Sequence, residues 1–312
     1  MLSRRNVRIK VMQMLYALGR DKELAFADAM RRYRETIARA FELYLFHLLY
    51  FIRAAEYAEK DAKRRQAKHR PTEEDKLFSP RLAQNPLIDS LRRNTLLNSL
   101  FTQYRLQEKI DDDLVRTLYG EFSKQDSYTA YLQKPEATPA DHAEQLLSLL
   151  RTCFASETFE DATEDWYPNW IDDKSLIVGA MKKTVKALPA EPLFYEEFKP
   201  PVEATVEFGE ALLQKVYEED QHLLEVIEPT LKNWDAERVA IIDMILLKMA
   251  LCELTSFPTI PTKVTLNEFV EISKLYSTEK SKDFINGILD RLMKKLHSEG
   301  RIHKEGRGLL EE

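Results

Sequence analysis

Several features common in folded proteins are scarce in this 312-residue chain. Its eight glycines are few for the length, and the alternation of apolar and polar residues that marks strands is rare. Long segments rich in Ala, Leu, Glu, Lys and Arg, which favour helices, take their place. A sheet-based fold is therefore excluded, and we expect an all-α protein. With 44% hydrophobic residues the chain can bury a substantial core.

Catalytic and metal-binding motifs are also missing. The chain contains no GxxxxGK[ST], GxGxxG, HExxH, GxSxG or CxxC motif. Its six histidines have no ligand-like spacing, and the adjacent Asp111, Asp112 and Asp113 would point in different directions on a helix. We therefore expect no enzyme, no metal ion and no cofactor, and we place these aspartates at a joint or exposed turn.

Long hydrophobic runs are absent as well. The densest apolar run, from Phe41 to Ile52, is too short to span a bilayer and contains Glu42 and His47. The basic N-terminus lacks the apolar segment of a signal peptide. The two cysteines, Cys153 and Cys252, indicate small core residues in a reducing compartment. We expect a cytoplasmic protein with no membrane partner.

Charge is distributed unevenly along the chain. The formal net charge of −6 argues against a non-specific nucleic-acid coat, but not against a local binding site. Residues 1–20 contain five basic residues and no acid, whereas residues 157–173 contain seven acids and no base. The acidic stretch also carries Trp166, Tyr167 and Trp170, so it is either a solvated loop anchored by aromatic side chains or a docking surface for a basic partner.

Apolar periodicity and helix-breaking residues divide the chain into expected helices. These cover about 4–18 with Ser3 as N-cap, 23–69, the block 87–122 with a break at 111–113, 139–155, 173–188, 202–228 as one long helix, 236–254, and two more within 264–296. The prolines at 189, 192, 200 and 201 form the clearest boundary. The basic end of the second helix, Lys60 to Arg70, fits a solvated helix end near the negative pole of the helix dipole.

Two segments suit an RNA ligand. On the first helix Arg5 and Tyr16 share one side, which is either an ordinary surface or an RNA-contacting edge. The joint between the last two helices, from Lys274 to Phe284, mixes cations with aromatic residues, as a phosphate-bearing and base-stacking ligand requires. Asn286-Gly287 would ordinarily mark a turn, but the apolar stripe continues in phase through the pair. We expect a helix there, in which Gly287 permits a close approach to the backbone.

Four segments, in the same order along the chain, resemble the NusB transcription antitermination family. They are Arg4–Tyr16 (RRNVRIKVMQMLY), Asn233–Leu254 (NWDAERVAIIDMILLKMALCEL), Ile260–Lys274 (IPTKVTLNEFVEISK) and Lys280–Asp290 (KSKDFINGILD). The resemblance covers about residues 1–20 and 202–296. It implies a NusB-like helical bundle at 1–20 and 200–296 with a second core helix within 23–57, a helical insertion at 58–199 and a flexible tail at 297–312. Most relatives are about half as long.

The resemblance also implies a function. NusB proteins bind the boxA element of nascent ribosomal RNA together with NusE, a small-subunit ribosomal protein, and support the antitermination form of the transcription elongation complex. The residues that would bind RNA here are Arg4, Arg5, Arg8, Tyr16, Tyr276, Lys280, Ser281, Lys282 and Phe284. The NusE surface in the family involves the central helix, so the partner-binding candidates are Asp243, Lys248 and Glu253.

The chain departs from the family pattern in places. Asn6 replaces a residue that is often basic, Lys280 stands where an acid can occur, and Thr230 takes a position that can be aromatic. Asn169-Trp170 and the residues after it parallel Asn233-Trp234, so the insertion is open to interpretation as a degenerate second copy. The alternative function is a helical protein-interaction scaffold with a vestigial RNA site. The non-catalytic module of an RNA methyltransferase is a weaker one, because no cofactor-binding α/β domain is present.

Overall fold

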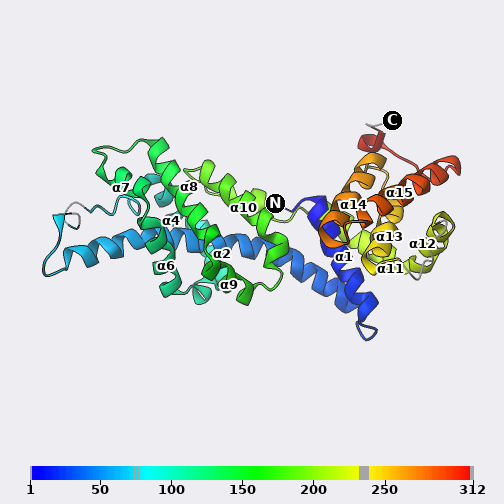
Figure 1. The fold of residues 1–312 in the computed structure, drawn as a ribbon, viewed down its shortest axis with the longest axis horizontal. Coiled ribbons are helices and arrows are strands. Elements are labelled where there is room, and N and C mark those ends of the chain that lie inside the picture. The colour runs from blue at the N-terminus through cyan, green and yellow to red at the C-terminus, as the bar shows by residue number, and fades with distance from the viewer. Residues whose placement is uncertain (1, 74, 76–77, 232–238, 310–312) are drawn as a thin grey trace. The chain divides into compact units, whose positions relative to one another are not determined.

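The computed structural model describes residues 2–73, 75, 78–231 and 239–309. They form two compact units, each with its own core (Figure 1). Unit 1 comprises Arg39–Lys199, and unit 2 comprises Leu2–Ala38 with Pro200–Glu312. All regular structure in the described residues is helical, which confirms the all-α fold class. No helix of this described part is long and apolar enough to cross a membrane.

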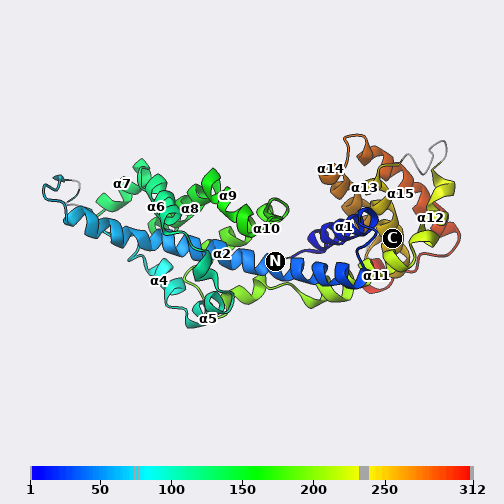
Figure 2. The ribbon, with the colours of Figure 1, turned by 90° about the horizontal axis from the view of Figure 1, so that it is seen from below.

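Unit 1 is built along the helix α2 (Phe26–Gln66), whose first part belongs to unit 2. Its other helices are α4 (Pro86–Arg92), α5 (Thr95–Gln103), η1 (Leu106–Lys109), α6 (Asp112–Ser123), α7 (Asp126–Gln133), α8 (Pro139–Ala155), α9 (Glu157–Trp166), α10 (Trp170–Lys186) and η2 (Phe194–Phe198). Figure 2 shows α4 and α5 on one side of α2 and α6 to α9 on the other. The core is rich in aromatic rings, among them Phe46, Tyr50, Phe159 and Trp170.

The caps of unit 1 follow from local sequence. Asp111 caps α6 by accepting a hydrogen bond from the Asp113 amide at 2.8 Å, so the aspartate triplet marks a helix start, at the joint expected for it. Thr138 and Asp141 form a capping box at the start of α8. The described residues contain no cluster of His, Cys, Asp or Glu arranged to hold a metal ion.

The expectation of a solvated acidic loop at 157–173 is wrong. Glu157–Trp166 is the helix α9, and α10 begins at Trp170. The acids Glu157 and Glu160 lie in the first turn of α9, where the helix dipole favours negative charge, and Phe159 and Thr163 are buried one turn apart. This one-turn spacing of buried residues is a helical pattern that the run of acidic residues obscures.

The basic end of α2 is less solvated than expected. Arg64 and Arg65 pair with the buried Asp61 at 2.6 and 2.9 Å. Lys68 pairs with the buried Asp75 at 2.8 Å. These cations therefore compensate two carboxylates that would otherwise be buried alone.

Unit 2 surrounds the helix α13 (Ile241–Ser256), which packs against α1, α11, α12, α14 and α15. The elements of the unit are α1 (Arg4–Arg20), the start of α2, the π-helix η3 (Glu203–Glu210), α11 (Ala211–Glu218), α12 (Asp220–Ile227), η4 (Glu228–Thr230), α13, α14 (Thr262–Tyr276), α15 (Ser281–Ser298) and η6 (Gly306–Leu309). Every residue of α13 from Leu246 to Leu254 is buried, as its apolar circumference predicts. The expected helical residues 236–238 and the corner at Asn233, Trp234 and Asp235 lie outside the described residues.

The single long helix expected over 202–228 is not formed. The segment is divided into η3, α11 and α12, with a break at Glu219. Tyr33 donates a hydrogen bond to the Thr205 carbonyl of the π-helix at 2.8 Å, and a Cβ on Gly209 would lie 1.9 Å from the Tyr33 Oη. The tyrosine of α2 therefore occupies space that only glycine leaves open, a tertiary constraint that helical periodicity does not show.

The segment after α15 contacts the corner between α13 and α14. Lys304 donates to the Phe257 carbonyl at 3.1 Å, and the Glu305 amide donates to the Pro258 carbonyl at 3.0 Å. Part of the segment expected to be a flexible tail is therefore hydrogen-bonded to unit 2.

Candidate RNA-binding site

The start of α1 presents the first arginines of the expected site. Ser3 is the N-cap, as expected, and Asn6 completes a capping box by accepting from the Ser3 amide at 3.2 Å. Asn6, which replaces a basic residue of the family pattern, therefore fixes the helix start. From Val7 to Met12 the helix is buried on all sides, so Ile9 and Met12 do not form an exposed face with Arg5.

Arg4 and Arg5 are partly exposed and already paired. Arg4 contacts Glu203 at 2.6 Å. Arg5 forms a bidentate pair with Glu268 of α14, through Nε at 2.7 Å and Nη2 at 2.8 Å. Arginine carries five N–H donors, so Arg5, whose side chain is 43% exposed, keeps donors for a further acceptor.

Arg8 requires a correction. Its side chain is 2% exposed and donates to Glu253 of α13 through Nε and Nη2, both at 2.7 Å. The Thr265 hydroxyl donates to the same carboxylate at 2.7 Å, and the guanidinium lies over the ring of Phe208. Arg8 is thus a structural residue joining α1 to α13, and it is not available to a phosphate here.

Arg5 and Arg8 are linked through one carboxylate. Glu268, which pairs with Arg5, also lies 3.8 Å from Arg8 Nη1. The chain Arg5–Glu268–Arg8–Glu253 therefore runs from the surface to the core and fixes the first turns of α1 against α13 and α14. Buried Arg8 positions Arg5.

A second carboxylate organises the joint between α14 and α15. Asp243 of α13 is buried and accepts from the Ser277 hydroxyl at 2.5 Å and from the Ser281 hydroxyl at 2.7 Å. Ser281 is buried too. Asp243 and Ser281 therefore determine how the joint packs on α13. Neither of them presents a free polar group to RNA in this structure.

The cations of this joint lie near α1. Glu271 of α14 accepts a hydrogen bond from Lys274, which lowers the pKa of the carboxyl, and the charges of Arg5 and Lys282 lower it further. One carboxylate thus lies within electrostatic reach of a cation from α1, one from α14 and one from α15. Lys280 is exposed and has no ion-pair partner among the described residues.

The sequence prediction does not include Glu268 and Glu271, because carboxylates repel a phosphate backbone and are not expected in an RNA site. For Glu271 the sequence gives one indication: it precedes Lys274 by three residues, a spacing that favours an ion pair on a helix.

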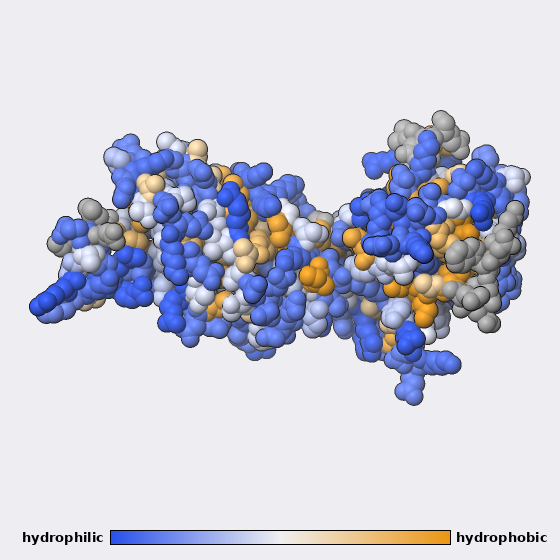
Figure 3. All heavy atoms as spheres, viewed as in Figure 1, coloured by the Kyte–Doolittle hydropathy of each residue, from blue (hydrophilic) through white to orange (hydrophobic). Residues whose placement is uncertain are grey.

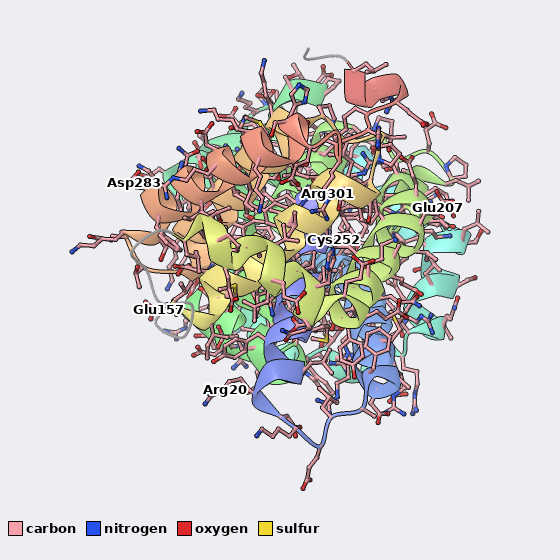
Figure 4. All side chains as sticks on the ribbon, turned by 90° about the vertical axis from the view of Figure 1, so that its right-hand side faces the viewer. Arg20, Glu157, Glu207, Cys252, Asp283 and Arg301 are labelled. Carbon is pink, nitrogen blue, oxygen red and sulfur yellow. The ribbon has the colours of Figure 1, made fainter. Side chains whose placement is uncertain are left out.

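Apolar and aromatic groups border the same joint. Tyr276 and Phe284 are half-buried, and Phe284 lines a pocket of about 510 Å³ together with Lys280, Asp283 and Gly287. No described atom lies within 4 Å of a Cβ built on Gly287, so the helical Asn-Gly pair faces open space. In Figure 4 Asp283 lies at the outer edge of unit 2 and Cys252 within the bundle. Tyr16 is 40% exposed but lies about 16 Å along α1 from Arg5.

All three partner-binding candidates are buried, but one of them borders a groove. Glu253 and Asp243 are buried, at 0% and 4% exposure, so neither forms an open docking surface here. Lys248 pairs with Asp220 at 2.6 Å and borders an apolar groove of about 500 Å³ between α1, α11, α12 and α13. Tyr217 and Ile241, both nearly half exposed, line this groove.

Comparison with known proteins relates the second half of the chain to one family. The model of the NusB family matches residues 178–294. The transcription antitermination protein NusB of Geobacter sulfurreducens is 37% identical over 115 residues, which cover 37% of this chain and 83% of that protein. The chain belongs to the NusB family. It is similar to the NusB of Salinibacter ruber, at 41% over 107 residues, covering 34% of this chain and 67% of that protein.

A third NusB relative, from Chloroherpeton thalassium, is 40% identical over 101 residues, covering 32% of this chain and 46% of that protein. No solved structure matches the chain. The relatives are named as transcription antitermination proteins, so the relationship identifies a non-enzymatic factor, as the absence of catalytic motifs predicts. The similarity covers only about a third of the chain, which makes this an enlarged NusB protein.

Proposed function

We propose that this NusB protein is an RNA-binding antitermination factor that binds boxA-like single-stranded RNA together with NusE. The observation that carries the proposal is the convergence of Arg5, Lys274 and Lys282 around Glu271. Arg5 of α1 and lysines of the consecutive helices α14 and α15 contribute cations around one carboxylate, although the whole chain has a net charge of −6. Such a local cluster attracts a phosphate backbone without a basic protein as a whole.

The groups around this cluster suit a single strand. Arg5 and Lys282 bind phosphates with the N–H donors that their carboxylate partners leave free. Lys280 has no carboxylate partner among the described residues, so it can bind a phosphate without breaking an ion pair. Tyr276 and Phe284 offer ring faces or edges to unstacked bases, and the pocket beside Gly287 has room for a base edge. Glu268 and Glu271 hold the cations in place, and they also compete with phosphate.

Titration of labelled boxA-like RNA at several salt concentrations, with and without NusE, tests the proposal. Each phosphate contact on a single strand contributes about −0.7 to the slope of log K against log salt concentration. Arg5→Ala and Lys282→Ala should each weaken binding and make the slope shallower by about that amount. Arg20→Ala, an exposed arginine at the other end of α1, is the matched control and should change neither. Equal slopes for Arg5→Ala and Arg20→Ala contradict the RNA site.

For NusE we propose the groove beside Lys248, because Lys248, although buried, borders it, whereas Asp243 and Glu253 do not belong to its lining. Its exposed Tyr217 and Ile241 form an apolar surface beside the Lys248–Asp220 pair. Ile241→Asp should weaken NusE binding at least tenfold, because it puts a charge into an apolar interface, and leave binding of RNA alone unchanged. Val206→Asp, also at a nearly half-exposed apolar position of unit 2, is the control.

One observation favours the alternative of a scaffold with a vestigial RNA site. Arg4, Arg5 and Arg8 are each paired with a carboxylate. The scaffold predicts that NusE is captured equally well with and without RNA, and that boxA-like RNA binds no better than a scrambled sequence at any salt concentration.

A further inference from the structure

A groove in unit 1 has no role in the proposed RNA site. It lies between α8 and α10, which pack side by side, and has a volume of about 400 Å³. Its apolar lining comes from Leu147, Leu150, Phe154 and Ala155 of α8 and Val178 of α10. The Leu147, Phe154 and Val178 side chains are only partly buried, so the groove offers apolar surface to a partner. On the face of each unit seen in Figure 3, apolar surface occurs as separate patches among hydrophilic side chains.

The charged residues around this groove have one sign. Arg151, Lys182 and Lys186 line it, all three are exposed, and no carboxylate belongs to the lining. None of the three has an ion-pair partner among the described residues. The cations at the end of α2 differ, because they pair with Asp61 and Asp75. The positive charge around the groove is therefore uncompensated within unit 1.

We propose that the groove between α8 and α10 binds an acidic amphipathic helix of a partner protein. The apolar side chains of that helix, spaced i, i+3, i+4 and i+7, enter the groove, and its flanking carboxylates pair with Arg151, Lys182 and Lys186. From Val178 to Lys186 the groove extends about 12 Å along α10, which matches about two turns of a docked helix.

The lining distinguishes this occupant from RNA. Bases bind on flat, open aromatic faces, whereas four of the five apolar side chains here are aliphatic. The one ring, Phe154, stacks on buried His47 at 5.4 Å and on Trp170 at 6.4 Å, so the core already uses its face. An aliphatic floor with a basic rim suits leucine-like anchors flanked by Asp or Glu.

The test uses the full chain and a labelled synthetic helix of about 16 residues, with Leu at i, i+3, i+4 and i+7 and Glu on both flanks. Fluorescence anisotropy should show saturable binding. A peptide with Lys in place of Glu, and a scrambled peptide of equal composition, should bind at least tenfold more weakly. Titration followed by methyl NMR should shift Leu147, Leu150 and Val178, and leave Leu15 and Ile241 of the other apolar groove unchanged.

Charge reversal separates this site from general attraction. Lys182→Glu/Lys186→Glu should weaken binding of the acidic helix about tenfold, because two favourable exposed pairs become repulsive. Lys124→Glu/Arg70→Glu, at exposed cations elsewhere in unit 1 for which the described residues provide no ion-pair partner, is the matched control and should leave binding unchanged. Circular dichroism checks that both variants keep the helical fold.

Several results overturn the proposal. If both double variants weaken binding equally, the peptide is attracted by the net charge of the protein and not by this groove. If the scrambled peptide binds equally well, the groove does not recognise an amphipathic helix. Binding of a labelled oligouridylate that shifts Leu147 and Val178 assigns the groove to RNA. Dimers that Lys182→Glu/Lys186→Glu abolishes in sedimentation assign it to a second copy of this chain. Loss of boxA-like RNA binding in unit 2 leaves this test unaffected, so failures of the two proposals are distinguishable.

Discussion

Removing Arg8 from the buried pair with Glu253 tests how unit 2 is held together. Arg8→Met keeps an unbranched side chain between α1 and α13 and deletes the charge. Glu253 then remains in the core, at 0% exposure, and among the described residues it keeps the Thr265 hydroxyl as a donor and the more distant charge of Lys304. An isolated buried carboxylate is strongly disfavoured, so the variant must unfold more readily or bind a proton.

The expected magnitude follows from burial. Breaking one partner out of a buried ion pair typically costs about 3–5 kcal/mol. Loss of the cation–π contact with Phe208 adds about 0.5–2 kcal/mol. The double variant Arg8→Met/Glu253→Leu leaves no buried charge, so it should recover most of the loss. Arg4→Ala, which breaks the exposed pair with Glu203, should cost at most about 1 kcal/mol.

Hydrogen exchange followed by mass spectrometry is the appropriate assay, because a two-unit chain need not unfold in one step. Peptides from α1 and α13 should exchange faster in Arg8→Met, and peptides from α8 in unit 1 should be unchanged. The double-variant cycle then gives the coupling between the two residues. The reasoning is refuted if peptides from α1 exchange as slowly in Arg8→Met as in Arg4→Ala. It is also refuted if the double variant exchanges as fast as Arg8→Met.

Three further predictions concern single positions. Gly209→Ala should destabilise unit 2 by about 1–3 kcal/mol in the same exchange assay, and less beside Tyr33→Phe, because the added Cβ meets the Tyr33 Oη. Burial lowers the pKa of His47 to about 4, so its contribution to stability is present above pH 6.5 and is lost as the pH falls to about 4. This amounts to about 3 kcal/mol, and His47→Phe should flatten the dependence of unit 1 unfolding on pH by that amount. Asp243→Asn should weaken RNA binding while α13 keeps its exchange protection, because the amide cannot accept from both serines.

Much of the architecture was predictable from local patterns. The Ser3 cap, the helix 139–155 and the continuity of α15 through Asn286-Gly287 follow from side-chain chemistry and period within a few residues. The π-helical start of 202–228 did not, because it packs against Tyr33, more than 160 residues earlier in the chain. The helix at Glu157–Trp166 was missed for another reason, since a dense run of acids hid the spacing of Phe159 and Thr163.

The candidate site was also predictable only in part. The sequence predicts that the basic start of α1 and the lysine-rich joint are two halves of one RNA site, and Arg5 and Lys282 lie within electrostatic reach of the same Glu271. It did not separate surface cations from buried ones. Arg5 and Arg8 are three residues apart and chemically identical, yet one is 43% exposed and the other 2%.

By itself, the sequence determined that this protein is helical, that it has no recognisable catalytic site and that it belongs with NusB. These properties depend on composition, on periodicity and on segments that can be matched without knowing what they contact. Only the tertiary structure decided which charges are available, because access depends on the neighbouring helices. Arg8 is enclosed by α13 and α14, Asp243 accepts from two serines, and the described residues provide no carboxylate partner for Arg151, Lys182 and Lys186.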